Sequence, residues 1–342
     1  MTGVQHGGSP GSPHRSGPRR GGGGGDRLMV PEADFESYYG RSVVKPAPWE
    51  HDIAVYLFTG GVAAGSSLLA AGADLTGRPA LRRVARFGSL ASLLVSVGAL
   101  VRDLGKPSRF LNMLRVAKPT SPMSVGTWIL SLHGPFAGAA AAAELASMLP
   151  RRWKRGPVRL LLAVGRPAGM VGALTAPPVA AYTGVLLSDT ATPAWHSAYK
   201  ELPFVFCGSA AAASGGLGLL GAPVAEAGPA RAFAVGGALV ELVTERRMEQ
   251  SMGLAAEALH EGRAGRLMKA STALTAAGAL GALAGRRSRA LSMISGAALM
   301  AGSLCTRLGV FEAGIASAKD PKYTVVPQRE RVDRGEPVRY RG

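Results

Sequence analysis

The stretch IAVYLFTGGVAAGSSLLAAGA, which runs from Ile53 to Ala73, contains no charged side chain. An α-helix rises about 1.5 Å per residue, so a run of this length crosses the roughly 30 Å hydrocarbon core of a lipid bilayer. After Ala73, further apolar runs follow along the chain, separated by short polar segments. The runs predict spanning helices over residues 53–73, 84–101, 124–148, 158–187, 203–225, 230–244, 270–285 and 291–308. The sequence therefore predicts an all-α, polytopic membrane protein with about eight transmembrane helices.

Charge is distributed in the same pattern. Only 18% of the 342 residues are charged, and the formal net charge is +17. An ordinary soluble domain carries about 25% charged residues. Lys and Arg gather at the ends of the apolar runs, as in residues 151–155, where such side chains meet anionic lipid and fix insertion topology. Basic charge placed in this way indicates membrane lipid as a partner and argues against nucleic acid.

The two ends of the chain differ from its middle. Residues 1–48 are rich in Gly, Ser, Pro and Arg, and they predict a disordered tail with a short entry segment to the first span. Residues 49–310 form the predicted transmembrane domain. Residues 311–342 are charged and rich in turn-forming residues, and we expect them to form an extended polar tail.

Metal and haem ligands are scarce in this sequence. Cys207 and Cys305 each lie alone in an apolar run, without C-x-x-C spacing. His133 lies within the third span and has no second histidine in a partner position, so we interpret it as a packing residue. We therefore expect no metal or haem in this chain. Any redox centre must belong to a partner or to a diffusible carrier.

Asp103 is the sharpest candidate for chemistry. An ionisable side chain within or beside a span is costly, so it is a functional candidate by default. Asp103 ends the second span in a short segment that also holds Arg102, Lys106 and Arg109. Two interpretations remain open. The carboxyl group takes up protons from a reduced carrier, or it holds the loop in place by ion pairs.

Two tyrosines lie close to the ends of spans. Tyr182 follows Pro177 and Pro178, which predict a kink or break in the fourth span. A phenol in this position either donates a hydrogen bond to a quinone oxygen or belongs to the aromatic belt at the membrane surface. Tyr56 and Asp52, near the start of the first span, allow the same pair of interpretations.

The sixth span ends in acidic residues. Glu241 and Glu245 lie four residues apart and so share one face of a helix. They either form an entry route for protons or merely mark the end of the span. The polar, helix-prone residues 245–269 that follow predict an interfacial helix before the seventh span.

Three segments together resemble a known family. They are PWEHDIAVYLFTGGVAAGSSLL at residues 48–69, DLGKPSRFLNMLRVAKPTSPMSVGTW at residues 103–128 and AYTGVLL at residues 181–187. They are similar to the NrfD/polysulfide reductase membrane-subunit family, the quinone-interacting membrane anchors of molybdopterin and related multi-subunit oxidoreductases. The resemblance extends over roughly residues 49–308, and the block from Asp103 to Trp128 is its most specific part.

The resemblance implies two four-helix bundles with a quinone site at one membrane face. It matches the family's quinone-contacting tyrosine to Tyr182 and a proton-handling acid to Asp103. Tyr56 occupies a first-span position that is histidine in some members, and a phenol cannot shuttle protons near neutral pH as an imidazole does. Trp128 also fits an aromatic belt. The predicted quinone-binding residues are Tyr182, Tyr56, Asp52, Arg109 and Trp128, with Asp103 as the catalytic, proton-handling residue.

The function implied by this resemblance is electron transfer with a diffusible quinone. The chain would bind menaquinone or menaquinol and exchange electrons with a docked, ferredoxin-like iron–sulfur subunit, beside a molybdopterin catalytic subunit. It would lie in the cytoplasmic membrane and catalyse nothing alone. A non-catalytic anchor and assembly platform is the alternative. A secondary transporter ranks last, because it would require paired broken helices in both halves and only the fourth span is strongly broken.

Overall fold

The structure is a computed structural model that describes residues 42–49, 51–104, 106 and 108–335. Within these ranges the side chains of His51, Arg109 and Phe110 are excepted. The tail predicted over residues 1–48 lies, as far as residue 41, outside the described residues. All regular elements in the described ranges are helices, which confirms the predicted all-α class.

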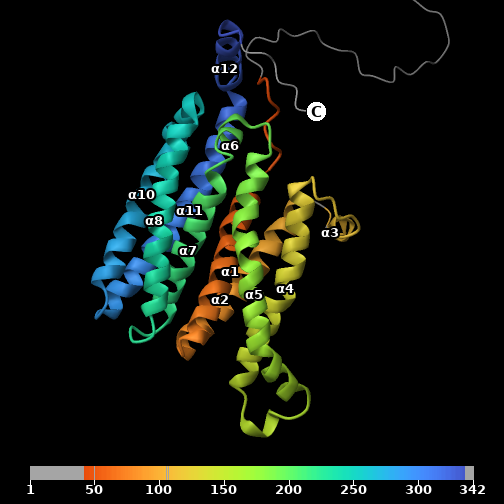
Figure 1. Ribbon diagram of the computed structural model, residues 1–342, viewed down its shortest axis with the longest axis vertical. Helices are drawn as coiled ribbons and strands as arrows, with labels where there is room; N and C mark the ends of the chain where they lie inside the picture. The colour runs from red at the N-terminus through yellow and green to blue at the C-terminus, as the bar shows by residue number, and fades with distance from the viewer. Residues whose placement is uncertain (1–41, 50, 105, 107, 336–342) are drawn as a thin grey trace, which may run out of the picture. The chain divides into compact units, whose positions relative to one another are not determined.

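In the described part of the chain, eight long helices carry the fold (Figure 1). They are α1 (His51–Leu75), α2 (Pro79–Asp103), α4 (Pro122–Ser147), α5 (Pro157–Ser188), α7 (Leu202–Gly221), α8 (Gly228–Ser251), α10 (Gly262–Ala284) and α11 (Arg289–Lys319). Short helices connect or follow them: α3 (Arg109–Met113), η1 (Arg151–Trp153), α6 (Pro193–Ser197), η2 (Gly253–Ala256), α9 (Glu257–His260) and α12 (Lys322–Asp333).

Six of the long helices are long and apolar enough to cross a membrane, namely α1, α2, α5, α7, α10 and α11. The other two, α4 with 26 residues and α8 with 24, have the length of a span but are not among these six. His133 and Pro135 interrupt the apolar run of α4, and α8 carries Arg231 among its apolar residues. A multi-pass membrane protein is therefore confirmed, while crossing by α4 and α8 stays a prediction.

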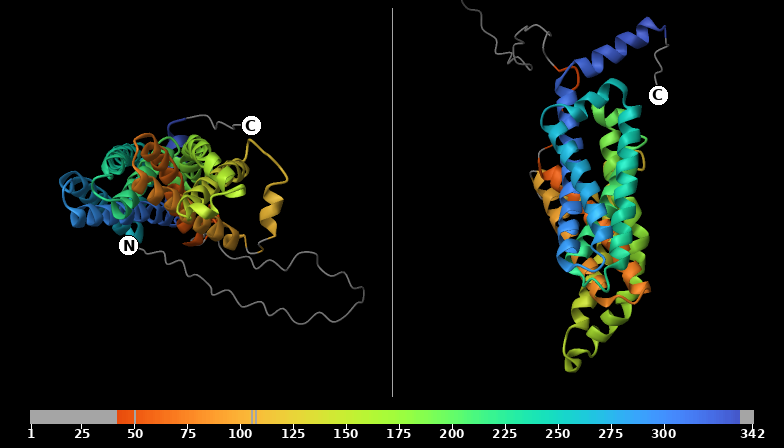
Figure 2. Two further views of the ribbon diagram at one scale, coloured as in Figure 1. Left: turned by 90° about the horizontal axis from the view of Figure 1, so that it is seen from below. Right: turned by 90° about the vertical axis from the view of Figure 1, so that its left-hand side faces the viewer.

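The long helices form two groups that lie side by side (Figures 1 and 2). In one group α1 packs on α2 and α5, and α4 packs on α5 and α2. In the other, α7 packs on α8 and α11, and α10 packs on α11 and α8. Helices α1 and α5 also pack against α7, which joins the groups, and one apolar core runs through both, including Leu57, Val179, Phe206 and Val310.

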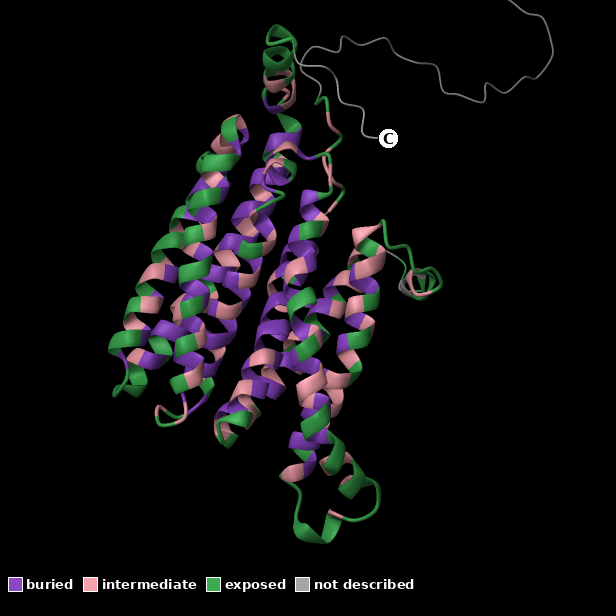
Figure 3. Ribbon diagram, in the orientation of Figure 1, coloured by how far each residue is buried: buried purple, intermediate pink, exposed green. Residues whose placement is uncertain are grey.

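Small residues allow the helices to approach closely. A Cβ atom added to Gly216 of α7 would overlap the carbonyl oxygen of Gly296 on α11, and the converse holds for Gly296. Close backbone approach of this kind replaces the hydrophobic drive that is missing between helices in lipid. Buried residues accordingly face the helix contacts, while exposed residues run along the outer faces (Figure 3).

The fourth span is not broken at Pro177 and Pro178, and the kink that these prolines also predict stays a prediction. Helix α5 continues without interruption through Pro177 and Pro178 to Ser188. Ala176 and Val179, on either side of the prolines, are fully buried against neighbouring helices. In an apolar environment a helix satisfies its remaining backbone groups internally, so packing keeps α5 helical despite the lost N–H donors.

The extended tail expected over residues 311–342 is also wrong as far as Asp333. Helix α11 continues to Lys319, because Phe311 and Ala313 are buried and Phe311 packs on the Trp195 ring at a centroid distance of 5.8 Å. Helix α12 follows, and Tyr323 anchors it as a buried side chain. These contacts stabilise helical turns in a segment whose own composition is polar.

The interfacial helix predicted over residues 245–269 is likewise wrong. Helix α8 continues to Ser251, and α10 already begins at Gly262. Glu245 and Met248 face the interior of the second group, so the buried face of α8 extends beyond its apolar run.

Candidate functional site

A cavity lies at the end of the first helix group, where α1 and α4 begin and α2 and α5 end. Its space for a water-sized molecule is about 50 Å³, and its lining is mostly apolar. The lining residues are Trp49, Ile53, Tyr56, Leu100, Asp103, Leu104, Met113, Met123, Thr127, Leu130, Tyr182 and Leu186.

Two buried tyrosines meet in this cavity. The rings of Tyr56 and Tyr182 lie edge to face with centroids 6.4 Å apart. Within the described part of the chain, the buried Oη atom of Tyr182 has no hydrogen-bond partner. Gly126 of α4 makes room for the Tyr182 ring, because any Cβ at this position would overlap the ring carbons. The glycine of the P-T-S-P-M-S-x-G-x-W block therefore shapes the tyrosine's site.

Asp103 faces the cavity from the last turn of α2, and it is partly exposed. The neighbouring Arg102 turns to the surface, where its Nε lies 3.4 Å from Oδ2 of Asp52 on α1. Asp103 is therefore the carboxyl group in the cavity, whereas Asp52 forms an ion pair at its rim.

Trp128 is not among the residues that line the cavity. Trp128 is 44% exposed, and its Nε1 donates a hydrogen bond of 3.3 Å to the carbonyl oxygen of Val116. The Ser124 hydroxyl donates to the same carbonyl and accepts from the Lys118 N–H, so α4 holds the segment after α3 in place. Arg109 begins α3, but its side chain lies outside the described residues.

Trp49 is a cavity residue that the sequence did not single out for this role. Its ring stacks on Trp195 with centroids 5.7 Å apart. Trp195 is buried, donates from Nε1 to the carbonyl oxygen of Val310 at 2.7 Å, and contacts Phe311. The aromatic stack thereby connects the cavity wall to α11. The only sequence signal for Trp49 is its position directly after Pro48 and shortly before the first span.

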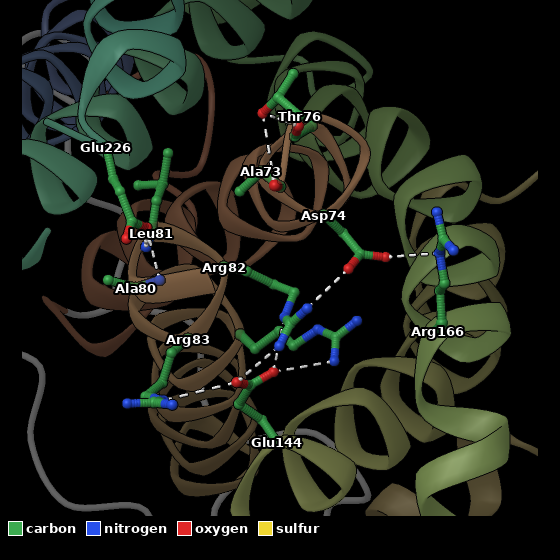
Figure 4. Close-up of polar contacts among 12 residues, drawn as sticks. Ala73, Asp74, Thr76, Ala80, Leu81, Arg82, Arg83, Glu144, Arg166 and Glu226 are labelled. Carbon is green, nitrogen blue, oxygen red and sulfur yellow. Dashed lines mark hydrogen bonds and ion pairs between the residues drawn. The ribbon is translucent and has the colours of Figure 1, made fainter. Parts of the chain in front are cut away.

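A second polar site lies at the far end of the same helices (Figure 4). The Glu144 carboxylate of α4 accepts from Arg82 Nε at 3.0 Å and from Arg86 Nη1 at 3.1 Å, and Arg83 lies 3.6 Å away. Asp74 of α1 pairs with Arg82 at 2.9 Å and with Arg166 of α5 at 3.1 Å. The network joins the four helices of the first group, and along α1 it lies about 27 Å of helix rise from Tyr56.

A chain of hydroxyl groups continues inward from this network. Ser67 and Ser89 share a hydrogen bond of 2.8 Å, and Ser67 Oγ lies 3.4 Å from His133 Nε2. His133 Nδ1 lies 3.0 Å from the Thr175 hydroxyl. His133 therefore has polar partners on both ring nitrogens, as a structural histidine does.

Comparison with known proteins gives one family. The family model described as polysulphide reductase, NrfD, matches residues 42–225, just over half of the 342-residue chain. The match covers the first helix group and α7, with the cavity and both tyrosines inside it. It agrees with the resemblance carried by the three sequence segments. A search of curated proteins finds no match.

Proposed function

Because the chain belongs to the polysulphide reductase, NrfD, family, we propose that it is the quinone-binding membrane subunit of a multi-subunit oxidoreductase. The observation that carries this proposal is the cavity in which Tyr56, Tyr182 and Asp103 meet. A phenol donor without a partner among the described residues and a carboxyl group at the mouth of an apolar cavity are the groups that a quinone ring requires.

Each residue has a distinct role in this proposal. Tyr182 donates a hydrogen bond from Oη to a quinone oxygen, and the Tyr56 ring packs against the bound ring. Menaquinol oxidation releases two electrons and two protons, and reduction takes up the same number. Asp103 exchanges the protons with the surface, and the electrons pass to or from the nearest cluster of the partner.

The cavity must widen to accept a ring. Its space of about 50 Å³ is well below the roughly 300 Å³ at which ordinary small-molecule sites begin. Met113, Met123 and Leu104 form the wall beside the α3 segment. Methionine is flexible and polarizable, so this wall can repack around an apolar ring.

Exposed basic side chains near the cavity support a proposal for the partner. Lys106, Arg115 and Lys118 are exposed near its mouth. We propose that an acidic face of a ferredoxin-like iron–sulfur subunit docks here and links the chain to a molybdopterin catalytic subunit. The whole assembly would lie at the cytoplasmic membrane.

Binding of menadione, a soluble naphthoquinone, to the purified full-length chain in nanodiscs tests this proposal by calorimetry. Tyr182→Phe removes one hydrogen bond worth about 1 kcal/mol, so the expected Kd rises about fivefold. Tyr199→Phe is the matched control, because Tyr199 lies near the same end but is 56% exposed and outside the cavity lining. Equal affinity in the wild type and in Tyr182→Phe would contradict the assignment of Tyr182.

The small cavity also supports a second candidate, a non-catalytic anchor for the same complex. In that case the wild-type chain binds no menadione, and turnover of the assembled complex with menaquinol does not change in Tyr182→Phe or Asp103→Asn. If quinone binds the chain here, both variants lower quinone-dependent turnover while the complex still assembles.

A further inference from the structure

The second helix group encloses carboxyl groups that quinone chemistry at the first group does not use. Glu241 and Glu245 of α8 are 0% and 4% exposed. Glu249 lies one turn further along the same face, and its side chain is 30% exposed, with Oε2 3.9 Å from His260 Nε2. Carboxyl groups thus recur every four residues from the surface to the interior.

The buried pair is only half satisfied. Glu241 Oε1 accepts a hydrogen bond of 2.6 Å from the Thr306 hydroxyl, which lies 2.5 Å from Ser271 Oγ. Glu245 Oε1 accepts a long bond of 3.4 Å from the Thr272 hydroxyl. The Oε2 atoms of both glutamates are buried, and neither has a partner within the described ranges.

One cation faces this pair. Arg307 of α11 is fully buried, donates from Nη2 to the Phe206 carbonyl oxygen at 2.6 Å, and lies 3.8 Å over the Phe206 ring. It interacts electrostatically with Glu241, whereas its hydrogen bond among the described residues goes to the Phe206 carbonyl and not to Glu241. Two ionised carboxylates and one guanidinium would leave a net charge of −1 in the interior.

The polar groups around the pair come from the other three long helices of the second group. Ser209 faces it from α7, Ser271 and Thr272 from α10, and Thr306 and Arg307 from α11, while Glu249 adds a like charge on α8 itself. Arg307 is the one cation in this described set. A bound metal cation would meet its positive charge, so a proton fits the site better.

The first helix group contains a buried carboxylate with a structural role, Glu144, which can be compared with the pair. Glu144 is 1% exposed and faces Arg82, Arg83 and Arg86. Its charge is compensated several times over. Glu241 and Glu245 have the opposite arrangement, with two acids for one cation, and a structural ion pair with Arg307 would require only one of them.

We propose that Glu241 and Glu245 together bind one exchangeable proton, which reaches them from the surface through Glu249. The proton cancels the net negative charge of the two carboxylates and Arg307. It also gives one carboxyl group an O–H, which can donate a hydrogen bond to a carboxylate oxygen that has no donor. A shared proton of this kind belongs to the pair and not to either residue. The proposal does not depend on quinone binding, since these residues lie beyond the cavity and beyond the family match at residues 42–225.

Infrared spectroscopy of the full chain in nanodiscs tests the proposal. A protonated carboxyl group gives a carbonyl stretch that shifts in D₂O, and we expect the wild type to show it at neutral pH. The band should be lost in Glu241→Gln and in Glu245→Gln. Glu312→Gln, which removes an acid paired with Arg263 at 3.3 Å, should retain it. A wild-type spectrum without this band, or the same band in both pair variants, overturns the proposal.

The entry of the proton through Glu249 is tested by a separate measurement. Glu249→Gln should retain the band but slow its hydrogen–deuterium exchange severalfold, and an unchanged rate overturns entry through Glu249. Carbodiimide labelling of the wild-type chain covers the case in which a pair variant does not fold. The reagent modifies protonated acids, so peptide mapping should find it on Glu241 or Glu245 and not on Glu144. Labelling of Glu144 alone, or of none of the three, contradicts the proposal.

Discussion

Gly126 and Tyr182 show how one residue prepares the position of another. In the sequence, Gly126 is only one residue of the block from Asp103 to Trp128 that carries the family resemblance, and nothing local explains it. The space that it leaves is filled by a ring from α5, a different helix. The close fit to Gly126 holds the Tyr182 ring in its place in the cavity wall.

We predict that Gly126→Ala displaces the Tyr182 ring. Overpacking of a dense interior costs roughly 1–3 kcal/mol, so the variant should unfold at a lower temperature and bind menadione more weakly. Gly138→Ala on the same helix is the control, because a Cβ at Gly138 meets nothing within 4 Å. Both are measured by thermal unfolding in detergent, and equal behaviour of the two variants would refute the steric role of Gly126.

Glu144 should be essential for the stability of the first helix group. In Glu144→Gln, the buried Arg86 and its neighbours lose their shared carboxylate. Removal of one partner from a buried ion pair costs roughly 3–5 kcal/mol. Glu257→Gln, which breaks an exposed pair with Lys322, should cost much less, because solvent screens an exposed pair. The comparison uses thermal unfolding of the purified chain, and a smaller loss for Glu144→Gln than for Glu257→Gln would contradict the prediction.

At the scale of helices, apolar runs predicted that the eight long elements exist, but not where they end. The runs report the part of a helix that faces lipid or apolar neighbours. Helix α8 continues past Thr244 because Glu245 and Met248 are buried inside the second group, and α11 continues because Phe311 packs on Trp195. Contacts between distant segments decide these ends, so a single sequence does not reveal them.

The docking of α6 on α11 depends on Trp195. Its ring fills the space left by Gly314, and Trp195→Ala should therefore cost roughly 3–5 kcal/mol and loosen the wall formed by Trp49. We expect a lower unfolding temperature together with weaker menadione binding. Trp153→Ala, at a 61% exposed site in η1, should change neither property. Matching losses in both variants would show that Trp195 has no special role.

At the scale of the whole bundle, some of the residues predicted for the candidate site line the cavity and others do not. Tyr182, Tyr56 and Asp103 meet in one cavity, as the resemblance implied. Trp128 and Asp52 share the same membrane end, but their partners are a loop carbonyl and Arg102. Sequence position brings residues to one end of a span, whereas rotation about the helix axis is fixed only by packing.

The helix count leads to a prediction about topology. If α4 and α8 both cross the membrane, Lys118 and Glu261 lie on one side, and Arg152 and Glu226 lie on the other. Single cysteines at these positions, in a chain lacking Cys207 and Cys305, should react with an impermeant maleimide from opposite sides of oriented vesicles. Labelling of Lys118→Cys and Arg152→Cys from the same side would show that α4 does not cross.

Arg307 also has a consequence for how the protein is made. It lies near the middle of α11, and a lone arginine at the centre of a spanning helix disfavours insertion by roughly 2.5–3.5 kcal/mol. Its carbonyl partner on Phe206 and its counter-charge on Glu241 belong to α7 and α8, which leave the ribosome earlier. Because synthesis proceeds from the N-terminus, α7 and α8 are made before Arg307. Helix α11 therefore enters a membrane that already contains the helices with which Arg307 interacts.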